Sequence, residues 1–279
     1  MNIRATLAVL VAALFASASG LPLYAGASWE EQSKLKIDRR DRIKDPEPPA
    51  IEFHNYGLQS VVLTNTWGAT AASSQNAKEG ATLKATPAGN PYITVDGFQY
   101  DLAQFHFHTP SKHAFAGNRT DMEVHFVHVK HYDACINDRP LVVLGGLIDA
   151  GKANPELAKL FTGDLPPGKG GSPAGVMVDG VNLLKLIPKG NPEWRYEGGL
   201  SAPNDTTCSG FGKGSLTQPL VTGEFPESVN WFLYDQKLHL STNAIDRFRA
   251  LFPEGNSRSI KELNGQTIYS STGNHTAWR

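Results

Sequence analysis

The alternation of hydrophobic and polar residues along the chain predicts a protein built mainly of strands. β-Branched and aromatic residues recur in short alternating runs, which are typical of strands. We expect such strands at residues 58–64, 92–95 and 98–103. The continuous apolar run at 141–148 suits a buried strand. The small and polar residues of 72–90 indicate a loop.

Two short segments carry helix signals instead. Asn154-Pro155 opens the first predicted helix, which runs through Phe161, because proline is favoured in a first helical turn. Thr242-Asn243 is expected to cap the second, over 244–252, which Pro253 ends. The chain also contains 27 glycines and 18 prolines, so many turns are expected.

The stretch Gln104-Phe105-His106-Phe107-His108 stands out within this pattern. In a strand, residues two apart point to the same face, so His106 and His108 share one face. Phe105 and Phe107 then point to the opposite face, as core residues would. The sequence therefore predicts a strand with a polar, histidine-bearing face.

A third histidine, His125, lies in the strand-like segment 123–128. Residues 116–119 read as a turn, so an antiparallel hairpin would bring His125 beside the first pair. Three neutral imidazoles with no fourth protein ligand form an open zinc site of the catalytic kind. Six of the nine histidines fall between 106 and 131, so chance clustering is the competing interpretation.

Length and charge limit the remaining possibilities. A chain of 279 residues with 40% hydrophobic content can bury one large core or two small ones. Its formal net charge of -1 gives no electrostatic reason to expect a nucleic-acid partner or a membrane surface.

Residues 1–20 resemble a secretory signal, with Arg4 before an apolar run and small residues at 16–20. No later stretch is long and apolar enough to cross a membrane. We therefore expect an exported protein, periplasmic or secreted. Export permits a disulfide between Cys135 and Cys208, but sequence alone does not show that the two cysteines meet.

Several motifs resemble the α-class carbonic anhydrase family. Gln-Phe-His-Phe-His-Thr-Pro-Ser at 104–111 and Glu-Val-His-Phe-Val-His at 123–128 are similar to its zinc core. Weaker similarity extends to 32–37, 141–145, 194–200, 229–232, 256–258 and 263–265. The resemblance implies one domain, residues 28–272, that is mainly β. It has a central, largely antiparallel twisted sheet and a few short peripheral helices.

The resemblance also implies zinc as cofactor, bound by His106, His108 and His125. Residues two positions away should orient two of these ligands, Gln104 for His106 and Glu123 for His125. In the family, a backbone carbonyl orients the remaining histidine. For His108 the corresponding residue is near Asn256. An apolar wall for carbon dioxide would come from Val127, Val143 and Leu200, which otherwise read as ordinary core.

The chain departs from the family pattern at the hydroxyl that orients the zinc-bound hydroxide. Tyr-Glu-Gly-Gly-Leu-Ser at 196–201 matches the upstream pattern and nominates Ser201. Gly-Ser-Leu-Thr at 214–217 matches the motif itself and nominates Thr217. We favour Ser201, with Thr217 as the alternative.

Two further departures concern charge and proton transfer. Lys112 stands where the family has a glutamate that accepts the proton of this hydroxyl, and an ammonium has donors only. Lys112 either lines the site or turns out to solvent. The family's shuttle histidine has no counterpart near 65–69, and His54 is the only upstream candidate.

The resemblance thus implies a zinc enzyme whose small-molecule substrate is carbon dioxide, which it hydrates reversibly and more slowly than the fast family members. The alternative is a zinc-binding relative with little or no hydratase activity, acting as a binding or storage protein, because a fold alone does not fix function.

Overall fold

The structure is a computed structural model. It describes residues 36–37, 42–66, 81–131, 141–167, 175–198, 229–257, 260 and 267–271.

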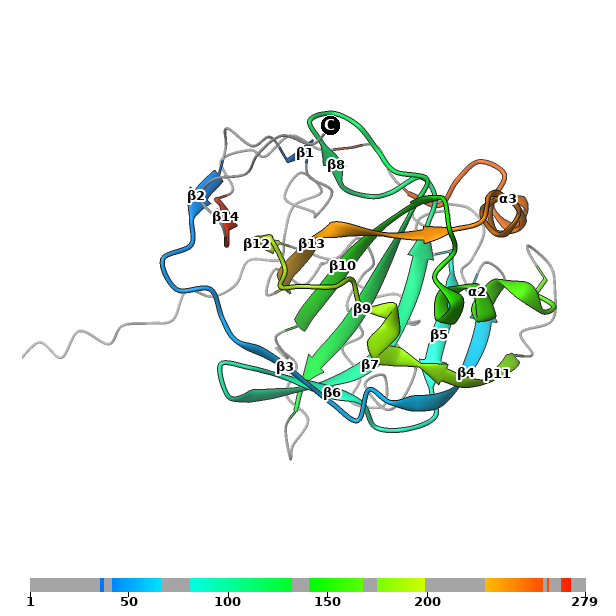
Figure 1. Cartoon of the computed structure of the whole chain (residues 1–279), viewed down its shortest axis with the longest axis horizontal. Coiled ribbons are helices and arrows are strands. Elements are labelled where there is room, and N and C mark those ends of the chain that lie inside the picture. Colours follow the sequence, from blue (N-terminus) through cyan, green and yellow to red (C-terminus); the bar gives the residue numbers. More distant parts are fainter. Residues whose placement is uncertain are drawn as a thin grey trace, which may run out of the picture.

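The described strands form one large, twisted mixed sheet (Figure 1). Its order is β11 (Val176–Asn182), β4 (Leu58–Asn65), β5 (Leu83–Pro87), β7 (Phe98–His108), β9 (Met122–Lys130), β10 (Leu141–Ala150), β13 (Val229–Leu240), β12 (Trp194–Gly198), β14 (Ile268–Ser270) and β2 (Arg42–Lys44). Two more strands, β3 (Ile51–His54) and β6 (Tyr92–Val95), extend it beside the start of β7. A separate pair joins β1 (Lys36–Ile37) to β8 (Ala114–Phe115). Most pairings are antiparallel, with β10–β13 and β14–β2 parallel within the large sheet. The fold class predicted from the sequence is confirmed.

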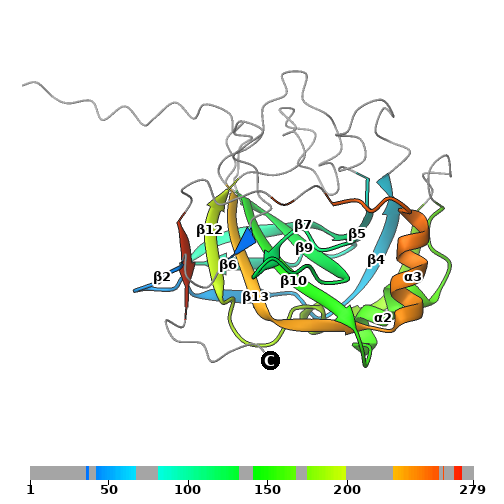
Figure 2. The ribbon, with the colours of Figure 1, turned by 90° about the horizontal axis from the view of Figure 1, so that it is seen from above.

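Two short helices lie together at the β4 and β11 side of the sheet (Figure 2). Helix α2 (Pro155–Thr162) begins as predicted, because the Asn154 side chain accepts hydrogen bonds from two backbone N–H groups of its first turn. Helix α3 (Thr242–Leu251) begins two residues before the predicted range, because Ser241 is the capping residue. A 3₁₀ turn, η3 (Leu183–Leu186), follows β11. Neither described helix has the length and apolar character needed to cross a membrane.

The expectation of a loop over 72–90 was wrong for its second half. Residues 83–87 form β5, which pairs with both β4 and β7. Its side chains alternate between buried and half-buried positions, and the buried ones are Leu83, Ala85 and Pro87, of which only Leu83 is a large hydrophobic residue. Partnership with two neighbouring strands, which sequence does not show, overrides the weak local preference.

The sheet separates two layers of core. On one face, Phe105, Phe107 and Phe126 pack together, and Phe107 contacts Phe161 of α2 and Phe248 of α3. The opposite face carries the histidines beside a second cluster that includes valines of β9 and β10 and tryptophans of β12 and β13. A register shift between Leu102 and Gln104 of β7 lets Leu102 and Phe105, three residues apart, contribute to the same hydrophobic cluster.

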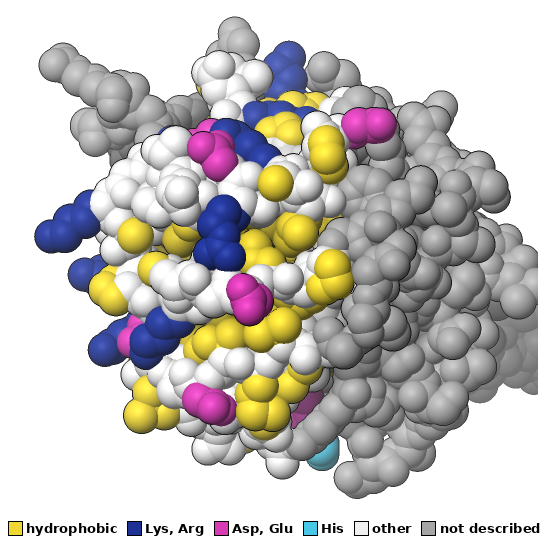
Figure 3. Space-filling view, turned by 90° about the vertical axis from the view of Figure 1, so that its right-hand side faces the viewer, with side chains coloured by type: hydrophobic (Ala, Val, Ile, Leu, Met, Phe, Trp, Pro, Cys, Tyr) yellow, Lys and Arg dark blue, Asp and Glu magenta, His cyan; other side chains and the backbone are white. Residues whose placement is uncertain are grey.

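The outer surface near the helices mixes hydrophobic side chains with charges of both signs (Figure 3). This distribution agrees with the near-zero formal net charge of the chain.

Candidate metal centre

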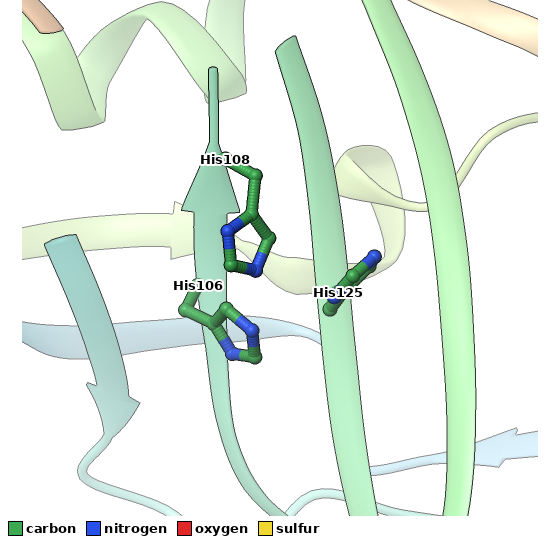
Figure 4. Close-up of side chains that lie close together, drawn as sticks. All are labelled: His106, His108 and His125. Atoms are coloured by element: carbon green, nitrogen blue, oxygen red, sulfur yellow. The ribbon is translucent and has the colours of Figure 1, made fainter. Parts of the chain in front are cut away.

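The pairing of β7 with β9 brings three histidines together. His106 lies directly opposite His125 in the antiparallel register, and His108 lies two residues further along β7. The centroids of the three rings are 4.8 to 5.2 Å apart. Figure 4 shows the rings of the two β7 histidines turned toward His125. The hairpin predicted from the sequence produces this convergence.

Each ring is held at one of its two nitrogens. His106 Nδ1 donates to Gln104 Oε1 at 2.9 Å, and His125 Nε2 donates to Glu123 Oε1 at 2.7 Å. His108 Nδ1 donates to the backbone oxygen of Asn256 at 3.2 Å. The structure therefore places each predicted orienting residue against its histidine.

The second nitrogen of each ring is left to face the others. His108 Nε2 is buried and has no hydrogen-bond partner. One ring nitrogen from each histidine lies within 4.8 Å of the others, an arrangement that could hold a metal ion. Three imidazole nitrogens suit zinc, which takes nitrogen ligands at about 2.0–2.1 Å. An orphaned buried nitrogen aimed at two more imidazoles fits a resident metal ion.

Burial keeps these rings neutral, as ligands must be. Desolvation lowers the pKa of His106 and of His108 well below the usual range, and that of His125 to about 4. The charge of Lys112 contributes to all three shifts in the same direction. At neutral pH the three rings therefore present lone pairs rather than positive charges.

Glu123 belongs to a hydrogen-bond relay that the sequence did not reveal. Its Oε1 also accepts from His113 Nδ1 at 2.6 Å, and His113 Nε2 meets the hydroxyl of Tyr196 at 2.6 Å. Burial acts to raise the pKa of Glu123, but the charges and hydrogen bonds of His113 and His125 lower it well below the usual range. The ionised Glu123 thus links the metal centre to β12. His113, Glu123 and His125 could also form a metal site by their spacing. Because Oε1 of Glu123 already accepts hydrogen bonds from both imidazoles, we interpret this group as a hydrogen-bond relay and not as a second metal site.

Asn256 has a wider role than its backbone carbonyl. Its side-chain oxygen accepts from the backbone N–H of Thr109, and its amide donates to the backbone oxygens of Ala81 and Phe107. These bonds tie the segment after α3 to the end of β7. Residues far apart in sequence make them, so no local signal could have identified them.

The walls beside the histidines are apolar. Val127 and Val143 lie opposite each other across β9 and β10 and are fully buried. The Trp231 ring contacts His125 at 4.8 Å between centroids and stacks on Tyr196. Opposite His125 stands Gly145, where a Cβ would come within 2.5 Å of Leu233. The residue at this position must therefore be small.

Lys112 is buried, with 4% of its surface exposed. The alternative in which this side chain turns out to solvent is therefore wrong. Desolvation lowers the pKa of Lys112 to about 8, against an opposing effect from the Glu123 charge. The backbone on either side is anchored, which keeps the residue beside β9.

Other predicted residues are remote from the histidines or lie outside the described residues. His54 stacks on Tyr92 and contacts Thr94, and Tyr92 pairs with Asp101 near the start of β7. That position is five residues along the strand from His106, so His54 is no shuttle candidate. Outside the described residues lie Ser201, Thr217, Leu200, Cys135 and Cys208.

Three histidines, two of them buried and one half-buried, converge on one face of a mixed sheet, and comparison with known proteins identifies the class as the α-type carbonic anhydrases. The model of the eukaryotic-type carbonic anhydrase family matches residues 22–209, which is more than half of the chain. The chain therefore belongs to this family.

Individual relatives are distant. A carbonic anhydrase of Neisseria gonorrhoeae is 29% identical over 182 residues, or 65% of this chain and 60% of that protein. One of Klebsiella pneumoniae is 29% identical over 188 residues, or 67% of this chain and 64% of that protein. The matched region thus spans less than two thirds of either relative. An α-carbonic anhydrase of Thermovibrio ammonificans, solved with the inhibitor sulfanilamide, shares the fold with a TM-score of 0.63 and 24% identity. That match covers 87% of this chain and 88% of the other.

Proposed function

We propose that the protein binds one zinc ion and catalyses the reversible hydration of carbon dioxide to bicarbonate and a proton. The observation that carries the proposal is the convergence of three imidazoles, two buried and one half-buried, each fixed at one nitrogen and open at the other. Membership of the carbonic anhydrase family supports the same chemistry.

Each histidine would bind zinc through the ring nitrogen that makes no hydrogen bond. His106 and His108 would bind zinc through Nε2, and His125 through Nδ1, because the other nitrogens are engaged. When bound at such a site, zinc lowers the pKa of a water ligand to about 7, a value already known from carbonic anhydrase itself. Val127 and Val143 would provide apolar surface for carbon dioxide.

The hydroxyl that would orient the zinc-bound hydroxide is proposed from the sequence alone, because both candidate residues lie outside the described part of the chain. We propose Ser201 for this role, with Thr217 as the alternative, and Leu200 as part of the apolar wall. Replacing each hydroxyl residue in turn by alanine distinguishes them, since only the correct one should lower the hydration rate strongly. A preorganised hydrogen bond of this kind is worth roughly 10²–10³ in rate.

We further propose that the mature domain, residues 28–272, is exported to the periplasm or secreted after removal of residues 1–20. The support is the sequence pattern of charged, apolar and small residues at the start of the chain. Amino-terminal sequencing of the exported protein tests this proposal.

One observation favours a second candidate function. Lys112 is buried and its charge acts on all three histidine rings, whereas the family pattern has a hydrogen-bond acceptor at this position. A protein that binds zinc but hydrates carbon dioxide feebly would then act as a binding or storage protein.

Stopped-flow measurement of carbon dioxide hydration, with zinc content determined on the same sample, separates the two candidates. An enzyme should show zinc-dependent hydration that the His125→Ala variant loses and that sulfanilamide inhibits. Zinc-loaded protein with a rate no greater than buffer would refute the enzymatic proposal and support the binding function.

A further inference from the structure

A hollow of about 630 Å³ lies between the start of α2, the segment from η3 to residue 189, and the end of β13. None of the described residues that line it belongs to the candidate metal centre. Its volume is within the range of roughly 300–1,000 Å³ that is usual for small-molecule sites. A ligand in this hollow would therefore be separate from the three histidines.

Hydrogen bonds of Asn154 join the three segments around the hollow. Its backbone N–H donates to the His239 oxygen of β13 at 2.9 Å, and its side-chain amide donates to the Lys185 oxygen of η3 at 2.8 Å. Its side-chain oxygen caps α2. On β13, residues 235–237 stand opposite Leu147 alone, and this bulge contributes Gln236 to the lining. The lining is therefore held by bonds that lie outside the hollow's charged side chains.

The charged side chains of the hollow are mostly lysines. Lys152, Lys185, Lys189 and Lys237 all line it, whereas Glu156 is the only carboxylate among the described lining residues. Like charges gathered in one concave surface attract anions and raise their local concentration. The lining therefore favours a negatively charged ligand.

The nearby carboxylates leave most of this positive charge unbalanced. Lys237 Nζ pairs with Asp149 Oδ2 at 2.7 Å, and Glu156 Oε2 already accepts from Lys159 Nζ at 2.8 Å. No ion pair between described residues involves the other three lysines. The hollow therefore has ammonium groups to offer to a ligand.

An adjoining hollow of about 550 Å³ has a different charge. It shares Lys189 and Lys237 with the first hollow but also contains Glu193 and Asp235. Only the first hollow includes Lys152 and Lys185. The excess of positive charge is therefore greatest on the side of α2 and η3.

Apolar surface lies beside these lysines. Leu184 lines the hollow and is 51% exposed, which is unusual for a large hydrophobic side chain. Ile187 and Leu238 are buried residues of the same lining. Covering exposed apolar surface is favourable, so the hollow suits a ligand that has an apolar ring as well as negative charges.

We propose that this hollow binds a small phosphorylated organic molecule of the size of a nucleoside diphosphate. The phosphates would meet the ammonium groups of Lys152 and Lys185, since lysine binds phosphate as a point charge. The ring of the ligand would cover Leu184. A diphosphate brings several negative charges to several lysines at once, which a single carboxylate does not. This inference is independent of the proposed function, because it needs no metal ion at the histidines.

The test is isothermal titration calorimetry of the whole protein in buffer without added divalent cations. ADP is the probe, and adenosine is its uncharged analogue. ADP should bind, and adenosine should bind at least about 10-fold more weakly, because it lacks the diphosphate. Added salt should weaken ADP binding, since exposed charges are screened.

Lysine variants locate the site. Lys152→Met and Lys185→Met should each weaken ADP binding about 5-fold, the effect of one unit charge near 4 Å in a watery environment. Lys185→Gln should do the same, which excludes an effect of the added apolar side chain. Lys44→Met, at an exposed position of β2 outside the hollow, is the matched control and should bind ADP as the wild type does.

Three results would overturn the inference: no ADP binding by the wild type at millimolar concentration, equal affinity for ADP and adenosine, or wild-type ADP affinity in both Lys152→Met and Lys185→Met. Phosphates also bind metal ions, so His106→Ala is measured as well. Unchanged ADP affinity in that variant supports a site away from the histidines, and loss of binding would overturn the inference. Because hydration is not measured, none of these results bears on the proposed function.

Discussion

At the residue scale, hydrogen bonding decides which nitrogen each histidine offers. Gln104 and the Asn256 carbonyl engage Nδ1 of their partners, whereas Glu123 engages Nε2 of His125. Such contacts fix the tautomer and the ring orientation, and their loss typically costs 10–100-fold in metal affinity. These contacts therefore determine which nitrogen of each ring would meet a metal ion.

The first prediction concerns the ligands themselves. Purified protein should hold about one zinc ion per chain, as one three-histidine site implies. His106→Ala, His108→Ala and His125→Ala should each lose most of that zinc, measured by elemental analysis after dialysis. His131→Ala, whose half-exposed ring pairs with Asp101 outside the site, is the control and should keep its zinc. Near-stoichiometric zinc in all three site variants would contradict the assignment.

A second residue-scale prediction concerns His128, which is buried away from the metal centre. Its Nδ1 donates to the Val142 oxygen at 3.3 Å, so its Nε2 accepts from the Tyr56 hydroxyl. Desolvation lowers the pKa of this ring to about 3. In the unfolded chain the pKa of this ring is near 6.5. Between about pH 3 and pH 6.5, the unfolded chain therefore binds a proton at His128 and the folded chain does not. Its contribution to stability is complete above pH 6.5 and is lost as the pH falls toward 3.

Urea unfolding at several pH values below 6.5 measures this contribution. One such proton makes the free energy of unfolding fall by about 1.4 kcal/mol per pH unit. The slope of His128→Phe should be shallower than that of the wild type by about this amount, whereas His131→Ala should keep the wild-type slope. Equal slopes in the wild type and His128→Phe would show that His128 is not the titrating group.

At the scale of elements, the strand register does most of the positioning. The β7–β9 pairing sets His106 against His125, and the β9–β10 pairing sets Gly145 on the other side of His125. A Cβ at Gly145 would lie 2.5 Å from Leu233 and 3.4 Å from Glu123 Oε1. Packing across three strands therefore determines which residue the position accepts.

Gly145→Ala should consequently destabilise the protein by roughly 1–3 kcal/mol, the usual cost of overpacking a core. Chemical denaturation is the measurement. Gly57→Ala is the matched control, because a Cβ there meets nothing within 4 Å, and it should cost little. An unchanged midpoint for Gly145→Ala would mean that Leu233 moves aside freely.

A contact in the candidate site could be predicted from the sequence only where the two residues are close together along the chain. The two-residue spacing of strands was sufficient to pair Gln104 with His106 and Glu123 with His125. The contact between His113 and Tyr196 joins residues 83 positions apart, and no periodicity encodes it. The burial of Lys112 could not be predicted either. Lysine is rarely buried, and the local sequence pattern allowed this side chain to point into the protein or out to solvent.

The same reasoning explains the errors in elements. The start of α3 was misplaced because Ser241, Thr242 and Asn243 are all good capping residues, and only the backbone geometry selects Ser241. Strand β5 was missed because its buried side chains include alanine and proline and its stability comes from its neighbours. By contrast, the long apolar run of β10 was predicted correctly, since every residue from Leu141 to Ile148 is buried.

At the scale of the whole molecule, the proton released by carbon dioxide hydration must be carried from the metal centre to solvent. None of the histidines in the described part of the chain is a convincing shuttle. His113 and His128 are buried in hydrogen bonds, and His54 lies near the far end of β7. His131 pairs with Asp101 near that same end. His239 lies opposite Asp149, four residues along β10 from the Gly145 that faces His125. We therefore expect the protein to depend on external buffer for proton transfer.

Raising the concentration of an imidazole-type buffer at fixed pH should increase the steady-state hydration rate severalfold. Stopped-flow with a pH indicator measures it, and a salt of matched ionic strength is the control. A buffer-independent rate near 10⁶ s⁻¹, roughly the value known for carbonic anhydrase, would show that an internal group carries the proton.

The central claim is that the three histidines hold one zinc ion that performs hydration. Titrating the metal-free protein with zinc while recording the hydration rate tests it most directly. We predict that the rate rises linearly with added zinc and reaches its plateau at about one zinc ion per chain. Protein that takes up one zinc ion per chain with no increase in rate over buffer would contradict the claim.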